Sequence, residues 1–231
     1  MIQEVLYSRD GQYVRKAWLI STENQPSGRL MVFLDGEFYV ERMNISTLLA
    51  ELGKKYGPFT GVFISNLDAE ARHYDYTCNQ AYAKFVAEDV LAWINDHYPD
   101  VQTTNSLIGG LSLSGLQSAY IAYTYPEIFN RILCQSPSFW WEQEWLLKNM
   151  NPDKIKNNQF WISVGDQEKD TNVQHPPTNL LQEVDQVTAV EHMVDFMKNH
   201  QIAVNYHPYA GGHNVSAWNT ELKEALIWLL Q

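Results

Sequence analysis

Cysteine is scarce in this sequence, with only two among 231 residues. Cys78 and Cys134 lie far apart, and two cysteines form neither a disulfide framework nor a zinc site of the usual spacing. We therefore expect two free thiols, packed inside the protein. Six of the seven histidines also lack any pairwise spacing typical of metal ligands. The sequence thus predicts no metal and no cofactor.

Positive charge is scarce as well, because 16 Lys and Arg residues oppose 27 Asp and Glu residues and leave a formal net charge of -11. Nucleic acids and anionic membranes attract clustered Lys and Arg, so neither is an expected partner. No apolar run approaches the roughly 20 residues that a membrane-spanning helix needs. The first ten residues lack the basic segment and apolar core of a secretory signal, and we expect a cytoplasmic protein.

Regular secondary structure is predicted along the whole chain. Short β-rich runs alternate with helical patterns, and 45% of the residues are hydrophobic, which suits one large α/β domain over residues 1–231. The alternation predicts a mainly parallel central sheet with helices on both faces. Strands are expected over residues 16–21, 29–34, 61–65, 132–136, 159–164 and 203–206, and helices over residues 82–97, 179–199 and 220–230. Because a turn-forming segment at 24–28 separates the first two strands, we expect them to form an antiparallel pair.

The most informative segment is residues 107–116, Leu-Ile-Gly-Gly-Leu-Ser-Leu-Ser-Gly-Leu, an apolar strand that leads into a helix reaching Tyr123. It resembles the nucleophile elbow G-x-S-x-G, in which small residues two positions on either side of a serine allow a strained strand-to-helix turn. Gly110 occupies the first small position and Ser114 the second, a modest departure from the motif. Ser112 is the candidate nucleophile.

A serine nucleophile needs a histidine base, which in turn needs a carboxylate to orient it. The strand ending at Val164 leads into a loop with the acids Asp166, Glu168 and Asp170. The last strand leads into Ala210-Gly211-Gly212-His213. Ligands of such folds bind at the carboxyl ends of the strands, and the order serine, acid, histidine is that of α/β-hydrolases. His213 is therefore the candidate base.

Several short motifs in the correct order resemble the catalytic domain of the enterochelin (siderophore) esterase family of serine esterases. They are Leu34-Asp35-Gly36-Glu37-Phe38, Arg72 to Asn79, the elbow at 107–116, Gln135 to Trp141, Gly165 to Glu168, and Gly211-Gly212-His213 with Trp218. The resemblance runs along nearly the whole chain. It implies an α/β-hydrolase fold and hydrolysis of ester bonds, in the namesakes those of catecholate siderophores.

The resemblance also implies roles for single residues. Ser112 matches the nucleophile of the family and His213 its base, while Glu168 matches the usual position of the acid. Asp166 and Asp170 lie close enough in the sequence to compete for that role.

Further residues are expected around the reacting ester. The oxyanion hole needs two backbone donors, for which we predict the amide of Leu113 and one from Gly36 or Glu37. Substrate contacts are expected in the run Phe139-Trp140-Trp141, whose Trp140 and Trp141 offer an apolar or stacking wall. By resemblance, Arg72 either orients an anionic substrate or pairs with Asp75.

The sequence therefore predicts a serine hydrolase that cleaves a small-molecule carboxylic ester through an acyl-enzyme, with a catecholate siderophore trilactone as one candidate substrate. Two alternatives stay open. One is a general carboxylesterase or an acyltransferase acting on another ester. The other is a catalytically inactive hydrolase fold used for binding, an alternative that Ser114 in the elbow leaves open.

Overall fold

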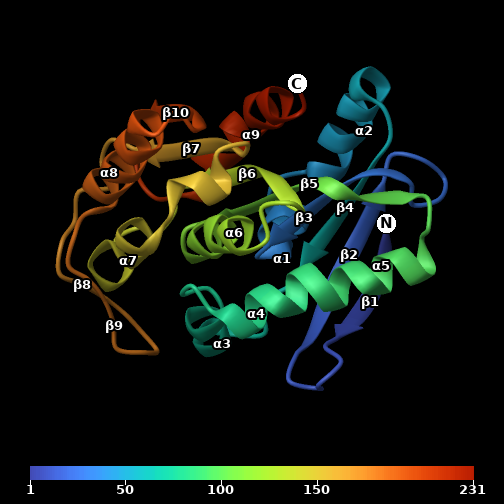
Figure 1. The fold of residues 1–231 in the computed structure, drawn as a ribbon, viewed down its shortest axis with the longest axis horizontal. Coiled ribbons are helices and arrows are strands. Elements are labelled where there is room, and N and C mark those ends of the chain that lie inside the picture. Colours follow the sequence, from blue (N-terminus) through green and yellow to red (C-terminus); the bar gives the residue numbers. More distant parts are fainter.

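The computed structural model describes residues 1–231 and contains one eight-stranded sheet with helices on both faces (Figure 1). The sheet runs in the order β1, β2, β4, β3, β5, β6, β7, β10. Its strands are β1 (Ile2–Tyr7), β2 (Val14–Ser21), β3 (Gly28–Leu34), β4 (Phe59–Ile64), β5 (Val101–Leu111), β6 (Phe129–Gln135), β7 (Gln159–Gly165) and β10 (Ala203–Tyr209). A separate pair consists of β8 (Val173–His175) and β9 (Leu180–Gln182).

Helices lie on both sides of the sheet (Figure 1). They are α1 (Gly36–Arg42), α2 (Ile45–Tyr56), α3 (Ala69–Asp75), α4 (Gln80–Lys84), a π-helical turn (Phe85–Val90) that continues into α5 (Leu91–His97), α6 (Leu113–Thr124), α7 (Trp141–Asn149), α8 (Gln186–Asn199) and α9 (Val215–Leu229). A short 3₁₀ turn covers Pro152–Ile155. None of these helices combines the length and the hydrophobicity that a membrane-spanning segment requires.

Two hydrophobic clusters fill the space between the sheet and its helices. One, of 42 buried residues, lies under α4 to α8 and includes Leu116, Leu146 and Val190. The other, of 21 buried residues, lies under α1, α2 and α9 and includes Leu49 and Leu222. Because both faces of the central strands are buried, these strands are apolar along their length, as in β4, where all six residues are buried.

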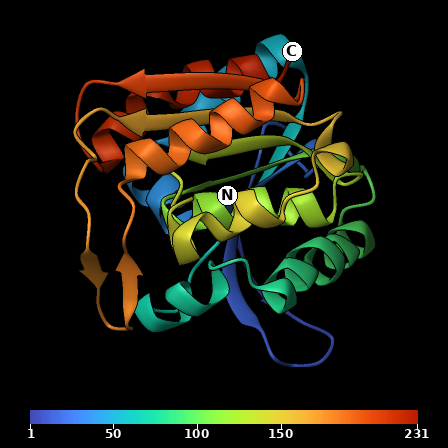
Figure 2. The ribbon, with the colours of Figure 1, turned by 60° about the vertical axis from the view of Figure 1, so that its left-hand side comes forward.

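The parallel part of the sheet places several strand ends at one edge. Strands β4, β3, β5, β6, β7 and β10 run parallel to one another, whereas β1 and β2 are antiparallel to their neighbours. Figure 2 shows β7 and β10 ending on the same side, where the chain also leads to the β8–β9 hairpin. The predicted mainly parallel sheet is thus confirmed, and its carboxyl edge is where a site is expected.

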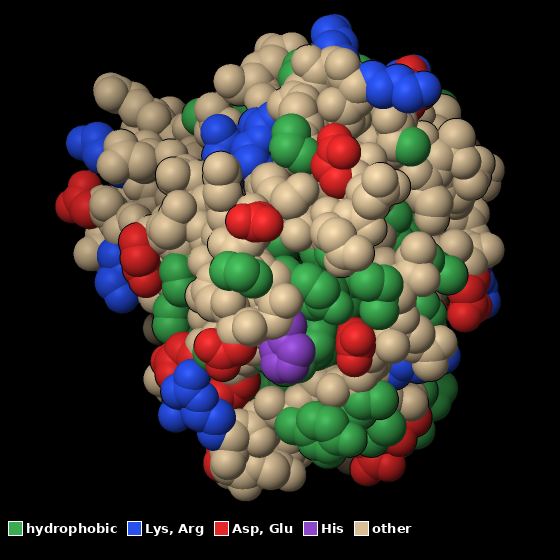
Figure 3. Space-filling model, turned by 90° about the vertical axis from the view of Figure 1, so that its right-hand side faces the viewer, with side chains coloured by type: hydrophobic (Ala, Val, Ile, Leu, Met, Phe, Trp, Pro, Cys, Tyr) green, Lys and Arg blue, Asp and Glu red, His purple; other side chains and the backbone are tan.

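The other side of the molecule shows no single large apolar surface. Figure 3 faces the side on which β1, β2 and α5 lie, and its hydrophobic side chains form patches between charged ones. Exposed hydrophobic side chains of the β1–β2 ribbon include Val5, Tyr7 and Val14. Small exposed apolar areas of this kind are normal for a folded protein.

Two expectations from the sequence are wrong. The strands at 16–21 and 29–34 do not pair, because β4 lies between β2 and β3, antiparallel to the first and parallel to the second. Thr60 of β4 bonds both the N–H and the carbonyl of Ser27, so the predicted turn crosses over β4. The fully buried β4 needs hydrogen-bonding partners on both sides, and this requirement overrides the local turn signal.

The second error concerns the helix expected over 179–199. Helix α8 begins only at Gln186, where the Asp185 carboxylate accepts a hydrogen bond from the Thr188 N–H and caps the helix. Leu180 to Gln182 instead form β9, which pairs with β8 outside the main sheet. The other predicted strands and helices are present, most of them longer than expected, and Cys78 and Cys134 are free thiols, half-buried and buried respectively.

Candidate active site

Ser112 lies on a sharp turn between β5 and α6. Its backbone has φ 56° and ψ -124°, a positive φ that a non-glycine residue rarely adopts. Gly110 permits the turn, because a Cβ atom there would lie 2.3 Å from the carbonyl oxygen of Ser114. Hydrogen bonds from Ser112 N to the Gln135 carbonyl (2.9 Å) and from Ser138 N to the Ser112 carbonyl (3.0 Å) hold the strained residue in place.

Ser114 occupies the second small position of the elbow and stabilises it. Its hydroxyl accepts a hydrogen bond from Leu111 N (2.8 Å) and donates one to the Leu111 carbonyl (2.7 Å). Ser114 is fully buried, so its hydroxyl is removed from water and needs these two hydrogen bonds with the Leu111 N–H and carbonyl. The departure from glycine therefore leaves the elbow intact.

The histidine and one of the three candidate acids lie in direct contact. His213 Nδ1 is 2.6 Å from Glu168 Oε2. The other carboxylate oxygen of Glu168 accepts hydrogen bonds from Ser136 Oγ (2.8 Å), Gly165 N (2.8 Å) and Tyr209 OH (3.0 Å). Burial alone would raise the pKa of the Glu168 carboxyl, but the hydrogen bond and charge of His213, with the bonds from Gly165 and Ser136, bring the pKa below its ordinary value.

The two competing acids lie elsewhere. Asp166 is exposed and accepts a hydrogen bond from Gly211 N (2.9 Å), so it fixes the loop that carries His213. Asp170 lines the cavity beside Ser112, but it accepts a hydrogen bond from Gln182 Nε2 through its backbone carbonyl and not through its side chain. Of the three acids, the structure brings only Glu168 to His213.

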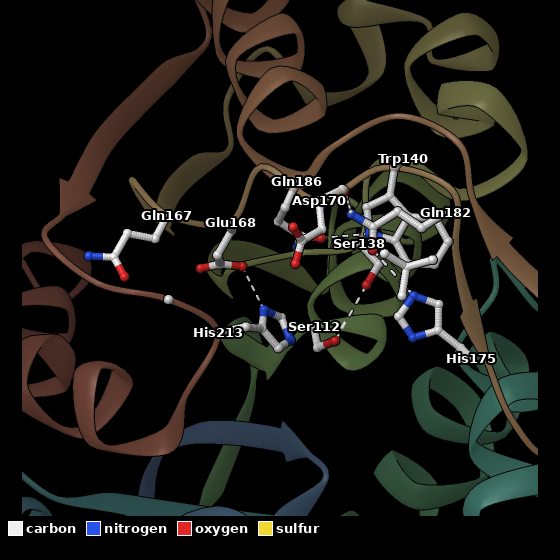
Figure 4. Close-up of a pocket in the computed structure, with 12 residues that line it drawn as sticks. Ser112, Ser138, Trp140, Gln167, Glu168, Asp170, His175, Gln182, Gln186 and His213 are labelled. Atoms are coloured by element: carbon white, nitrogen blue, oxygen red, sulfur yellow. Dashed lines mark hydrogen bonds and ion pairs between the residues drawn. The ribbon is translucent and has the colours of Figure 1, made fainter.

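Ser112 and His213 line one cavity of about 320 Å³ without a hydrogen bond between them. The Ser112 hydroxyl lies 3.4 Å from Ser138 Oγ, and Figure 4 shows it turned to that side, with the His213 ring on the other. Catalytic hydrogen bonds are often long or absent before substrate binds. Rotation of the Ser112 side chain toward His213 is the movement that a serine nucleophile at this place would need.

The three predicted oxyanion donors lie at helix N-termini. Leu113 is the first residue of α6 and Gly36 the first of α1, positions whose N–H groups have no acceptor within their own helix. Gly36 packs so closely on β4 that a Cβ atom would lie 2.5 Å from the Phe63 carbonyl carbon. Glu37 turns its side chain away to accept hydrogen bonds from Ser65 Oγ and Asn66 N (both 3.3 Å), and burial raises the pKa of its carboxyl.

Arg72 does not pair with Asp75, so that expectation is wrong. Its guanidinium lies 2.6 to 3.0 Å from the carboxylate of Asp35, a residue with no solvent exposure just before α1. Asp75 binds Arg15 instead. Both carboxylates are buried and each has its own guanidinium, Arg72 for Asp35 and Arg15 for Asp75, as buried charges require. Arg72 nevertheless lines a second cavity that Ser112 and His213 also line.

The aromatic run divides between the site and the core. Trp140 lines the first cavity, with its indole N–H bonded to Gln186 Oε1 (2.6 Å). Phe139 is buried in the core, and Trp141 packs edge-on against Trp145, outside the lining of either cavity. Trp140 therefore borders the first cavity with only 2% of its surface exposed, and Trp141 borders neither cavity.

Sequence reasoning missed four residues around the site. Ser136 and Tyr209 donate hydrogen bonds to Glu168. The Ser138 hydroxyl contacts the Ser112 hydroxyl, and His175 lines both cavities. Ser136 and Ser138 belong to a motif that carried the family resemblance, which is a signal that could have marked them. His175 stands in the hairpin that was not predicted. No group of three or more His, Cys, Asp or Glu side chains is arranged to hold a metal ion.

With this geometry in view, the similarity to known proteins is informative. A sequence model of the family described as "Putative esterase" matches residues 14–229. The chain belongs to this esterase family. Membership confirms the esterase family expected from the motifs.

Individual relatives agree with this assignment. Iron(III) enterobactin esterase from Escherichia coli O6:H1 (strain CFT073) is 25% identical over an alignment that covers 94% of this chain and 54% of that protein. The chain spans about half the length of the curated relatives that match it over nearly all of its own length.

Solved structures confirm the α/β-hydrolase fold. The enterobactin esterase FES from Shigella flexneri, in the presence of enterobactin, matches with a TM-score of 0.83 at 22% identity, covering 99% of this chain and 58% of that one. The BES protein from Bacillus cereus matches with a TM-score of 0.77 at 15% identity, covering 99% of this chain and 95% of that one.

Proposed function

We propose that this protein is a serine esterase that hydrolyses carboxylic esters through an acyl-enzyme on Ser112. One observation carries the proposal. Ser112, on a strained elbow, lines the same cavity as His213, whose Nδ1 is bound to the buried carboxylate of Glu168. A hydrogen bond from Nδ1 to Glu168 leaves the lone pair on Nε2, the nitrogen from which a base removes the serine proton.

The reaction follows from these positions. The Ser112 hydroxyl turns from Ser138 to His213 and loses its proton to Nε2 as its oxygen bonds to the ester carbonyl carbon. The carbonyl oxygen becomes an oxyanion, for which the N–H groups of Leu113 and of Gly36 or Glu37 are the proposed donors. His213 gives the proton to the departing alkoxide as the ester C–O bond breaks. Water then gives a proton to His213 as its oxygen bonds to the acyl carbon. His213 passes this proton to Ser112 Oγ as the bond between Oγ and the acyl carbon breaks, which releases the acid and restores the serine.

Glu168 has the role of orienting and charge-balancing partner. Its lowered pKa keeps it ionised near neutral pH, so it can stabilise the imidazolium that forms in each proton transfer. Its bonds come from Ser136, just after β6, and from Gly165 and Tyr209, the last residues of β7 and β10, and they fix the carboxylate against movement. The same carboxylate thereby holds the loop of His213 at the carboxyl edge of the sheet.

The substrate class that we propose is an ester of a siderophore. The relative named iron(III) enterobactin esterase supports this, and so does the first cavity, where the half-buried His175 ring, stacked at 5.1 Å on the buried Trp140, offers aromatic contact. The bond between Arg72 and Asp35 neutralises the arginine that was expected to attract an anionic substrate. The aromatic surface, and not a free cation, is therefore the proposed means of recognition.

Labelling and turnover test the proposal together. A fluorophosphonate should modify Ser112, as peptide mapping can show, and Ser112→Ala should lower kcat on the order of 10⁴- to 10⁶-fold. Ser46→Ala, at an exposed serine of α2, is the matched control and should keep both labelling and turnover. Labelling of an active enzyme at another residue would contradict the assignment of the nucleophile.

The assay should use p-nitrophenyl butyrate and a catecholate trilactone, the latter with and without iron. Hydrolysis of both esters by the natural protein, and of neither by Ser112→Ala, is the expected result. Hydrolysis of the p-nitrophenyl ester alone would leave the serine esterase in place and remove the siderophore substrate. Hydrolysis of neither ester, with no labelling, would favour a binding protein.

A further inference from the structure

His175 lies at the junction of two cavities. The first, of about 320 Å³, and the second, of about 510 Å³, share three side chains, which are Ser112, His175 and His213. Figure 4 shows His175 across from His213, with Ser112 between them. His175 comes from the β8–β9 hairpin, which His73 Nδ1 joins to α3 through Thr178 Oγ1 (2.8 Å). The hairpin therefore holds an imidazole beside the proposed nucleophile.

The two cavities suit the two halves of an ester. The first is lined by polar side chains such as Ser138 and Gln182, and the second by apolar ones such as Phe38 and Leu111. An ester bound for attack by Ser112 has its carbonyl carbon at the junction, with its acyl and alcohol parts leaving in different directions. A side chain shared by both cavities is then close to the atoms that flank the carbonyl on either side.

Hydrogen bonds fix which nitrogen of His175 is free. Gln182 donates through Nε2 to the Asp170 carbonyl (3.2 Å), so its Oε1 is the atom offered to His175 Nε2 at 3.2 Å. An amide oxygen only accepts, and His175 Nε2 must therefore carry the hydrogen. The ring is also stacked on Trp140 with an interplanar angle of 9°. This leaves Nδ1 as an acceptor that no hydrogen bond within the protein uses.

The neutral form of His175 is favoured by its surroundings. Burial lowers the pKa of the imidazole, the hydrogen bond to Gln182 acts in the opposite direction, and the positive charges of His213 and Arg72 lower the pKa further. A neutral imidazole keeps its acceptor lone pair near pH 7.

We propose that His175 is a specificity-determining residue whose Nδ1 accepts a hydrogen bond from an N–H or O–H group of the substrate, next to the scissile carbonyl. The substrate class is then an ester that carries such a donor close to its carbonyl group. This inference rests on the proposed serine esterase function. Sites built to bond a polar group discriminate strongly against substrates that lack it, because such a substrate shields the acceptor from water without giving it a partner.

Two esters of nearly equal shape test the inference. Ethyl N-acetylglycinate has an N–H where ethyl 4-oxopentanoate has a CH₂, and kcat/KM for each is divided by its rate of alkaline hydrolysis to remove intrinsic reactivity. We expect a corrected ratio on the order of 10 or more in favour of the N–H ester. His175→Phe, which keeps an aromatic ring against Trp140, should reduce the ratio to about 1. His175→Asn offers an oxygen near the position of Nδ1 and should restore part of it.

A matched control and the nucleophile variant separate the outcomes. His207→Phe alters another stacked histidine, 5.1 Å from Trp161 and outside both cavities, and should keep the natural ratio. A natural ratio near 1, or an unchanged ratio in His175→Phe, would overturn the role of His175. If Ser112→Ala still hydrolyses both esters, the proposed function itself fails, whatever the ratio.

Discussion

Two buried glutamates each lie beside a histidine near the end of the chain, and the two pairs differ in hydrogen bonding and in position. Glu168 Oε2 is 2.6 Å from His213 Nδ1, at the carboxyl edge of the sheet. Glu221, on α9, has its Oε2 3.9 Å from Nε2 of His207, which lies within β10. Side-chain exposure is nearly equal, at 4% for Glu168 and 3% for Glu221. Burial alone therefore does not distinguish a candidate catalytic acid from a structural one.

The number and kind of hydrogen bonds does distinguish them. Both oxygens of Glu168 accept hydrogen bonds, and the pKa of its carboxyl lies below the ordinary value. In Glu221, Oε1 accepts bonds from Ser163 Oγ (2.6 Å) and Gln135 Nε2 (2.8 Å), while Oε2 has no partner. Burial raises the pKa of Glu221 to about 7 despite these bonds. The fold thus stabilises the ionised form of one carboxyl and the protonated form of the other.

The largest expected contrast lies between the two histidines. His213→Ala removes the proposed base and should lower kcat on the order of 10⁴- to 10⁶-fold, because Ser112 then has no group to take its proton. His207→Ala should leave kcat close to that of the natural protein, since His207 packs on Trp161 and lines neither cavity. Steady-state hydrolysis of p-nitrophenyl butyrate measures both. A reversed pattern would show that the wrong pair has been assigned to catalysis.

The next contrast lies between the carboxyl groups. Glu168→Gln keeps the size of the side chain but removes its charge, and should lower kcat between roughly 10-fold and 10⁴-fold, because the imidazolium loses its counter-charge. Glu221→Gln should change kcat little, since Glu221 contacts neither Ser112 nor His213.

Asp166→Asn provides the matched control for the acid loop. Asp166 holds Gly211 by its side chain, so the substitution tests the positioning of the loop without removing the partner of His213. Its effect on kcat should be smaller than that of Glu168→Gln. A larger loss in Asp166→Asn would move the orienting role to Asp166.

Short-range sequence patterns predicted the parts of the molecule that depend on neighbouring residues. The elbow is local, since Gly110, Ser112 and Ser114 lie within five residues, and the buried strands β6 and β7 are continuous apolar runs. The proximity of the candidate serine, acid and histidine could be predicted because parallel strands end at the same edge of the sheet.

Long-range partners were not predictable in the same way. Two roles were expected for Arg72, orienting an anionic substrate or pairing with Asp75 three residues away, but it binds Asp35, which lies 37 residues earlier and is fully buried. The placement of β4 between β2 and β3 is likewise a non-local choice. The position of His175 depends on the β8–β9 hairpin, which has only three residues in each strand and little hydrophobic pattern.

The smallest expected effect is on stability, and it comes from Glu221. Its pKa is about 7 in the folded protein, against an ordinary value of 4.5, so between these pH values the folded state binds more protons than the unfolded state. The free energy of unfolding therefore falls as pH rises through this window, by about 3 kcal/mol at most for this group. Glu221→Gln removes the titration and keeps an oxygen to accept from Ser163 and Gln135.

Glu221→Gln should accordingly raise the free energy of unfolding more at pH 8 than at pH 5. Glu168 gives the free energy of unfolding the opposite pH dependence. The lowered pKa of its carboxyl contributes stability that is present above pH 4.5 and lost as the pH falls. Urea unfolding of the natural protein and of Glu221→Gln at both pH values measures the effect, and taking the difference between the two proteins at each pH cancels the contribution of Glu168. Equal differences at pH 5 and pH 8 would mean that Glu221 titrates alike in the folded and unfolded states, and the contrast between the two buried carboxyls would then reduce to their positions.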